Sequence, residues 1–225
     1  VSGLDAHPLD DIYNLAHAGW VLVVIYEHPD ETPRNIQLYD GLERVVGSIE
    51  DPSTLERAVD GASAVVNLVG TTAAKSERQF YSLHRDAPGR LAAAARLAGV
   101  RRFVHVSAMG IGLDAPSLAD RSKAAGENAV REAFPDASLV RPALVYGPGD
   151  HFFTLFAGLV RSAPAIPLIG GGRTRFQPMH VDDVAETMAR VLEEPDTAGR
   201  VFELGGLTDF FAIYPSREEG LAKLM

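Results

Sequence analysis

Residues 103–127 read FVHVSAMGIGLDAPSLADRSKAAGE, and this stretch decides the fold. It opens with the apolar run Phe103–Val106, which is typical of a buried strand, passes through a loop, and ends in a helical segment that carries Lys123. Ser107 directly follows the strand, so we expect its hydroxyl at the carboxyl edge of a sheet, where doubly wound folds bind ligands. Lys123 stands sixteen residues later. From these positions alone two interpretations stay open: Ser107 and Lys123 face one cleft from two different elements, or Ser107 caps a turn and Lys123 is a solvated helix residue.

The same alternation of short apolar runs and longer amphipathic segments extends over most of the chain. It predicts an α/β fold with a doubly wound, Rossmann-like parallel sheet covered by helices on both faces. Helix ends are also marked, because Asp51-Pro52 supplies a cap and a first-turn proline, and Gly99 stands where a left-handed helix end belongs. The predicted strands are Leu22–Tyr26, Arg44–Val46, Ala64–Leu68, Phe103–Val106 and Leu139–Val140.

The regular alternation breaks down after about Gly149, where proline- and glycine-rich connections begin. This change predicts a core over residues 1–150 and a smaller substrate-side lobe over residues 151–225 that does not fold independently. The helix Asp183–Glu194 and the strand Val201–Leu204 are expected to complete the lobe.

Composition limits the classes of function. The chain has 225 residues, 46% of them hydrophobic, and a net charge of -9 without clustered Lys or Arg, which argues against a nucleic-acid surface. There is no cysteine, which excludes disulfides and thiolate metal sites and fits a reducing compartment. No apolar run approaches the roughly 20 residues of a membrane helix. We expect a cytoplasmic protein with a few residues trimmed before Val1.

Five segments in chain order carry a resemblance to a known family. The first three are VVNLVG at residues 65–70, VHVSA at 104–108 and RSKAAGE at 121–127, and the last two are RPALVYGP at 141–148 and RFQPMHVDDVA at 175–185. Together they resemble the extended and atypical short-chain dehydrogenase/reductase superfamily. Within it the chain is most similar to the NAD(P)H-binding accessory subunit of respiratory complex I and its bacterial relatives. This likeness implies that residues 1–150 form a Rossmann-like nucleotide-binding core and that the protein could lie peripheral to the inner membrane.

The resemblance implies catalytic roles for Ser107, which would orient a carbonyl, and for Lys123, which would lower the pKa of a tyrosine that passes the proton. That tyrosine belongs four residues before the lysine, where this chain has Ala119. An alanine cannot transfer a proton. Tyr146 and His105 are the nearby groups that could take its place.

Cofactor contacts are expected from Asn67, Leu68, Gly70 and Lys123, because a glycine at the end of this strand lets the backbone approach a flat ligand. At the start of the chain the glycines of a phosphate-binding turn fall on Gly3, Asp5 and Pro8, so only Gly3 matches.

Glu27, after the second strand, would accept hydrogen bonds from a ribose diol. The cofactor is therefore expected to be NAD or NADP, with NAD favoured.

The substrate side is expected to use arginines, because guanidinium groups grip diphosphates or carboxylates with two hydrogen bonds. The candidates are Arg141, Arg173 and Arg175, with Tyr146 beside them. Ordinary surface or interlobe ion pairing of these arginines is the alternative. His180 followed by two aspartates is interpreted as the start of a helix, and no metal site is predicted.

Three hypotheses follow for function. The first is an atypical dehydrogenase/reductase with impaired or absent redox catalysis that serves as a complex I accessory or assembly factor. The second is an active NAD(P)-dependent nucleotide-sugar epimerase, dehydratase or reductase acting on a small-molecule substrate. The third is an interaction module that binds no dinucleotide.

Overall fold

The computed structural model describes residues 20–25, 36–40, 43–71, 74–148, 150, 152–154, 158, 161, 175–206 and 210–211. Residues that pack together fall into two units, Val1–Arg141 with Thr187–Phe202, and Pro142–Glu186 with Glu203–Met225. The chain thus leaves the first unit near residue 141 and returns to it for residues 187–202. The division predicted at residue 150 stays a prediction, although it did not foresee this return.

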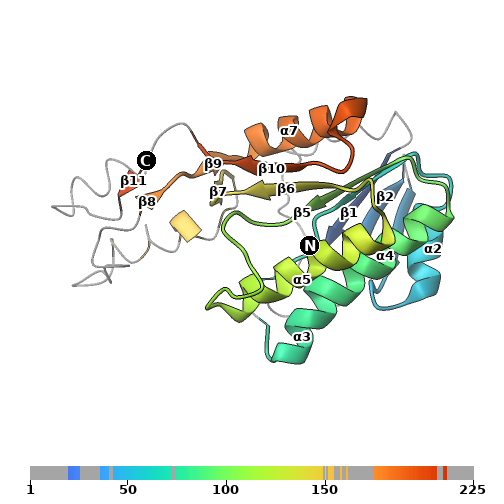
Figure 1. Cartoon of the computed structure of the whole chain (residues 1–225), viewed down its shortest axis with the longest axis horizontal. Coiled ribbons are helices and arrows are strands. Elements are labelled where there is room, and N and C mark those ends of the chain that lie inside the picture. The colour runs from blue at the N-terminus through green and yellow to red at the C-terminus, as the bar shows by residue number, and fades with distance from the viewer. Residues whose placement is uncertain are drawn as a thin grey trace. The chain divides into compact units, whose positions relative to one another are not determined.

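A seven-stranded sheet forms the centre of the first unit, in the order β10-β6-β5-β4-β1-β2-β3 (Figure 1). Strands β1, β4, β5 and β6 pair in parallel, which confirms the predicted parallel sheet. Strands β2 and β3 add an antiparallel edge that the apolar pattern did not predict. The strand bounds are β1 Trp20–Ile25, β2 Ile36–Asp40, β3 Glu43–Gly47, β4 Ala64–Asn67, β5 Arg102–Val106, β6 Ser138–Pro142 and β10 Val201–Leu204.

Two helix ends lie where the local sequence signals predict them. Asp51 caps α2 by accepting a hydrogen bond from the Ser53 backbone, with Pro52 in the first turn. Gly99, just past the end of α4, has φ of 77°, a left-handed conformation that favours glycine. The helix bounds are α2 Pro52–Val59, α3 Glu77–Tyr81, a π-helical segment Ser82–Asp86, α4 Ala87–Leu97, α5 Leu118–Ala133, α7 Val181–Glu193 and a 3-10 turn Pro195–Thr197.

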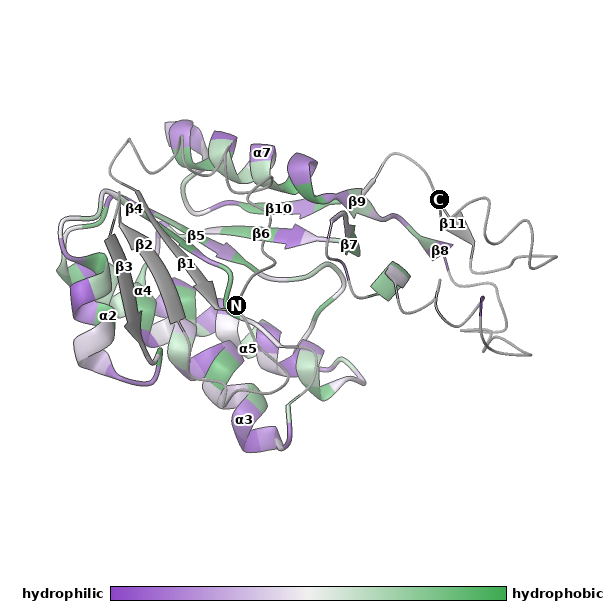
Figure 2. Cartoon of the chain, turned by 180° about the vertical axis from the view of Figure 1, so that it is seen from behind, coloured by the Kyte–Doolittle hydropathy of each residue, from purple (hydrophilic) through white to green (hydrophobic). Residues whose placement is uncertain are grey.

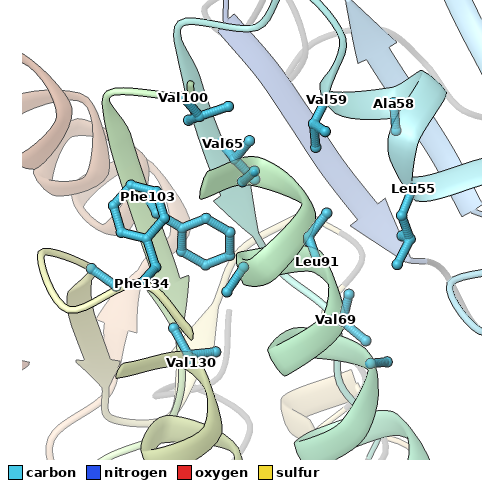
Figure 3. Close-up of a cluster of buried hydrophobic side chains, with 14 of the residues drawn as sticks. Leu55, Ala58, Val59, Val65, Val69, Leu91, Val100, Phe103, Val130 and Phe134 are labelled. Atoms are coloured by element: carbon cyan, nitrogen blue, oxygen red, sulfur yellow. The ribbon is translucent and has the colours of Figure 1, made fainter. Parts of the chain in front are cut away.

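Helices α2, α4 and α5 lie side by side over one face of the sheet (Figure 1). Hydrophilic and hydrophobic residues both occur along α4 and α5 (Figure 2), as expected of helices with one buried face. The buried face packs on β4 and β5 through a continuous apolar cluster (Figure 3). Within it the rings of Phe103 and Phe134 lie 5.5 Å apart, joining the strand of the opening sequence to the end of its helix.

The second unit contains two short pairs of strands. β7 (Val145–Tyr146) pairs in parallel with β9 (Met179–His180), and β8 (Arg175–Phe176) pairs antiparallel with β11 (Phe210–Phe211). Tyr146 lies edge-on to the rings of Phe153 and His180, at 5.9 and 5.2 Å between centroids. This aromatic cluster is the main packing feature among the described residues of the unit.

Candidate functional site

The carboxyl ends of β4 and β5 place two buried polar residues side by side. Asn67 and His105 are partners in the parallel register, and they are 0% and 3% exposed. Asn67 Oδ1 accepts a hydrogen bond from the Val69 backbone N–H at 3.1 Å, so its amide nitrogen faces His105 Nδ1 at 2.8 Å. Asn67 therefore shapes the turn after β4 and holds the ring of His105.

This arrangement determines the protonation state of His105. Because the Asn67 amide nitrogen is a donor, His105 Nδ1 accepts, and the ring proton lies on Nε2. Burial lowers the pKa of His105 to about 4, opposed by the carboxylate of Glu127. His105 is thus a neutral imidazole near pH 7.

Ser107 follows β5, as predicted, and its backbone N–H donates to the Val140 carbonyl at 2.7 Å. Its side chain is 8% exposed, and its Oγ is buried without a hydrogen-bond partner. A buried hydroxyl without a partner costs free energy, so such an atom calls for a ligand or a water to complete it.

Lys123 lies on α5, partly buried. Burial lowers the pKa of its ammonium from the usual value, and the nearby carboxylate of Asp120 opposes this shift. A desolvated cation of this kind favours an anionic or polar ligand beside it.

Ser107 and Lys123 line one cavity of about 110 Å³ in the first unit. The cavity also contains two of the predicted cofactor residues, Leu68 and Gly70, which the structure brings together with them. The remaining lining residues are Val69, His84, His105 and Val106. The nearest atom to a side chain built on Gly70 would be His84 Nε2 at 3.9 Å, so the backbone there is open to a ligand. The roles assigned to these residues stay predictions.

His84 is a member of this cavity that the sequence reasoning missed. It lies in the π-helical segment before α4, 2% exposed, and no motif surrounds it. A single histidine within an amphipathic helix carries no signal of its own in a sequence. Only the packing of that helix against α5 brings it to Lys123.

Ala119 is in the first turn of α5, where the resemblance places a tyrosine. Its carbonyl oxygen accepts a hydrogen bond from Ser122 Oγ at 2.8 Å. The position thus contributes a backbone acceptor, and its methyl group offers no proton.

Arg141 forms a two-pronged ion pair with Glu127, whose side chain is 5% exposed. Arg141 Nε donates to Oε1 at 2.8 Å and Nη2 to Oε2 at 2.6 Å. Binding of a substrate anion by Arg141 stays a prediction, and such an anion would compete with this carboxylate.

The remaining predicted cofactor and substrate residues belong to the second unit or lie outside the described residues. Tyr146 and the exposed Arg175 belong to the second unit. Gly3, Glu27 and Arg173 lie outside the described residues.

Two further features are absent from the part of the chain that the structure describes. It contains no group of three or more His, Asp or Glu side chains that could hold a metal ion. None of its helices has the length and apolar character needed to cross a membrane.

Comparison with known proteins identifies relatives of this arrangement. The model of the NAD dependent epimerase/dehydratase family matches residues 12–205. The mitochondrial NADH dehydrogenase (ubiquinone) 1 alpha subcomplex subunit 9 of Arabidopsis thaliana is 32% identical over 200 residues, covering 87% of this chain and 50% of the relative. A ceramide reductase of Caulobacter vibrioides is 32% identical over 185 residues, covering 80% of this chain and 56% of the relative.

Solved structures show the same fold. A double mutant of dTDP-glucose 4,6-dehydratase from Streptomyces venezuelae, with NAD bound, superimposes with a TM-score of 0.64 at 24% identity. The match covers 78% of this chain and 60% of that one. The chain spans about half the length of the first relatives it matches.

Proposed function

The chain belongs to the NAD dependent epimerase/dehydratase family, and from this premise we propose that it binds a nicotinamide dinucleotide as an accessory protein with impaired redox catalysis. One observation carries the proposal: the cavity keeps Ser107 and Lys123 while the tyrosine position holds Ala119. The site can receive a ligand, and it lacks the acid that carbonyl reduction requires.

Fit to the nicotinamide end of a dinucleotide is supported by the donors in the cavity. The Ser107 hydroxyl has no partner, and the Lys123 ammonium is partly desolvated. Beside them the backbone at Gly70 is open. Such a set can hold hydroxyl and amide oxygens of a bound dinucleotide, which would supply or accept hydride when catalysis occurs. NAD is favoured over NADP by Glu27, on the sequence argument alone.

Impaired catalysis is supported by the state of the two histidines. Carbonyl reduction needs one proton for the oxygen as hydride reaches the carbon. His84 and His105 have pKa values of about 4, so an imidazolium is scarce near pH 7 and neither replaces the tyrosine efficiently. His105 nevertheless lines the cavity together with Ser107 and Lys123.

Association with respiratory complex I is supported by the relatives named as alpha subcomplex subunit 9, found in plant, amoeba and rodent. The accessory role, a respiratory-complex partner and a location peripheral to the inner membrane are proposed for this chain on that likeness. The relatives are about twice as long, so their partners need not all contact the part represented here.

An active reductase or epimerase is the second candidate. The ceramide reductase relative and the retained Ser107 and Lys123 favour it. A module that binds no dinucleotide is the third, and the same experiment separates it from the others.

That experiment is a titration of the purified protein with NADH and NADPH, followed by nucleotide fluorescence and by melting temperature. We expect saturable micromolar binding, and a stabilisation of about 2.7 kcal/mol at a hundredfold excess of nucleotide over Kd. If neither NADH nor NADPH binds, the proposed function is excluded. Reduction of a carbonyl substrate at ordinary enzyme rates would instead support the second candidate.

Replacing Ala119 with tyrosine tests whether the site lacks only its acid. The variant places a phenol four residues before Lys123 on the same helix, one turn away. We expect nucleotide affinity to change little and carbonyl reduction, assayed by NADH oxidation, to rise by roughly a hundredfold from its basal level. Ala119→Phe is the matched control, since it adds the same ring without the hydroxyl. An equal rise in both variants would contradict the prediction.

A further inference from the structure

His84 occupies a position between two elements that are far apart in the sequence. Its Nε2 lies 3.0 Å from the backbone nitrogen of Thr71, in the loop after Gly70. Its Nδ1 lies 2.8 Å from Oγ of Ser122, the residue before Lys123. One ring therefore connects the loop at the end of β4 with the helix that carries Lys123.

The hydrogen-bond partners determine which nitrogen carries the proton. A backbone N–H can only donate, so His84 Nε2 accepts from Thr71. A neutral imidazole has one donor and one acceptor, so Nδ1 carries the proton and donates to Ser122 Oγ. The Ser122 hydroxyl then donates onward to the Ala119 carbonyl at 2.8 Å. The chain of bonds has a single direction, from Thr71 to Ala119.

The backbone of His84 also approaches α5 closely. In the π-helical segment Ser82–Asp86 the His84 carbonyl points at α5, and a β-carbon on Gly126 would lie 1.8 Å from that oxygen. Only a glycine at 126 permits this approach. The ring and the carbonyl of one residue thus contact the same helix about one turn apart.

Charged groups around the ring favour the neutral form. The Lys123 ammonium, on α5, opposes protonation of His84, and burial of the ring has the larger effect on its pKa. His84 also lowers the pKa of His105, on β5. The carboxylate of Asp120, on α5, raises the pKa of Lys123. A protonated His84 would direct an N–H at the Thr71 N–H and lose that bond.

We propose that His84 is a positioning residue, which holds the backbone at Gly70–Thr71 and the Lys123 helix at the separation the cavity requires. Both ring nitrogens are used, so it neither donates nor accepts a proton in a reaction. The nature of the cavity ligand rests on the proposed function, whereas the bonds of His84 do not.

The direct test is nuclear magnetic resonance of protein labelled with ¹⁵N in its histidine rings, near pH 7. We expect His84 to be neutral with the proton on Nδ1, and His105 to be neutral with the proton on Nε2. The two residues thus serve as internal controls with opposite tautomers. A His84 ring protonated on Nε2, or on both nitrogens, would overturn the proposal.

Conservative variants test the two bonds separately. Glutamine can place an acceptor near the position of Nε2, and asparagine can place a donor near that of Nδ1. We expect hydrogen exchange of the Thr71 amide to accelerate about tenfold in His84→Asn and to be restored in His84→Gln. Ser122→Ala should leave the Thr71 amide protected while weakening NADH binding several-fold. Unchanged Thr71 exchange in His84→Asn, or no rescue by glutamine, would refute the positioning role.

The same samples distinguish this proposal from the proposed function. If NADH fails to bind the unaltered protein while the tautomers and Thr71 exchange behave as expected, the function is wrong and the role of His84 stands. If NADH binds and His84 has the other tautomer, the proposed function stands and the role of His84 is wrong.

Discussion

At the scale of single residues, Glu127 is a buried carboxylate whose effect on stability depends on its ion-pair partner, Arg141. Its side chain is 5% exposed and that of Arg141 is 25% exposed. A buried pair adds little net stability over an apolar pair, but removing one partner leaves a charge without compensation. The carboxylate of Glu127 also opposes the lowering of the His105 pKa.

Glu127→Ala should therefore destabilise the protein by about 2 to 4 kcal/mol, because Arg141 would be left partly buried without its carboxylate. Urea unfolding measures the change. Glu132→Ala is the control, since Glu132 is exposed on the same helix, and its effect should be within about 0.5 kcal/mol of zero. Equal effects of the two substitutions on the free energy of unfolding would show that the ion pair contributes no more to stability than an exposed glutamate does.

The two buried histidines predict how stability depends on pH. Their pKa values are about 4 in the folded chain, against an ordinary value of 6.5 for histidine, so the folded state binds fewer protons than the unfolded state between these values. Their contribution is complete above about pH 6.5 and is lost as the pH falls towards 4. For each ring the loss is on the order of a few kcal/mol.

Urea unfolding at several pH values between 7 and 4 checks this. Stability should fall steadily across the window, and His84→Gln should reduce the slope by roughly half, because one of two titrating groups is gone. An unchanged slope in that variant would mean that His84 is not the neutral group described above.

At the scale of elements, the packing of α5 against α4 and the π-helical segment before it depends on two glycines in different ways. At Gly126, on α5, a β-carbon would lie 1.8 Å from the His84 carbonyl oxygen, which is a backbone atom. At Gly89, on α4, it would lie 3.2 Å from the β-carbon of Ala129, a small side chain. The first overlap cannot be relieved without moving a helix.

Gly126→Ala should consequently cost several kcal/mol, or prevent folding, although alanine is the better helix former. Gly89→Ala should change stability by about 1 kcal/mol or less, since a few tenths of an ångström relieve the contact. Melting temperatures of the two variants, measured together, test the comparison. A mild Gly126→Ala would show that the π-helical segment can withdraw from α5.

The sequence predicted single strands and helix ends better than it predicted contacts between distant residues. β10 was predicted at Val201–Leu204 and found there, and the Asp51 cap and the left-handed Gly99 were both confirmed. These features depend on neighbours within a few positions, so the sequence displays them directly. β2 and its antiparallel pairing were missed, because strand direction depends on how the chain turns between strands.

At the scale of the whole molecule, Arg102 joins the start of β5 to the stretch where the chain returns to the first unit. Its guanidinium donates to the carbonyl of Glu194 at 3.0 Å and also to the Val191 carbonyl and the Thr197 hydroxyl. These partners lie 89 to 95 residues later in the chain. The return is also held by Leu139 N–H, which donates to the Arg200 carbonyl at 2.9 Å.

Arg102→Ala should destabilise the first unit by about 2 kcal/mol, since hydrogen bonds from a charged donor to several acceptors, two of them part-buried, are lost together. Hydrogen exchange should show the increase in opening at residues 191–200. Arg101→Ala, at the exposed neighbouring position, is the matched control with little expected effect. If both variants unfold alike, the return of the chain does not depend on this guanidinium.

The sequence by itself determined the α/β class, the family and the placing of Ser107 and Lys123 beside one cavity. Local periodicity, helix caps and motif spacing suffice for these, because strand ends in a parallel sheet meet at one edge. Only the tertiary structure decided that His84 joins Thr71 to Ser122 and that Arg141 is paired with Glu127. Those contacts join residues 13, 38 and 14 positions apart, at distances set by the packing of helices on the sheet, which no local pattern records.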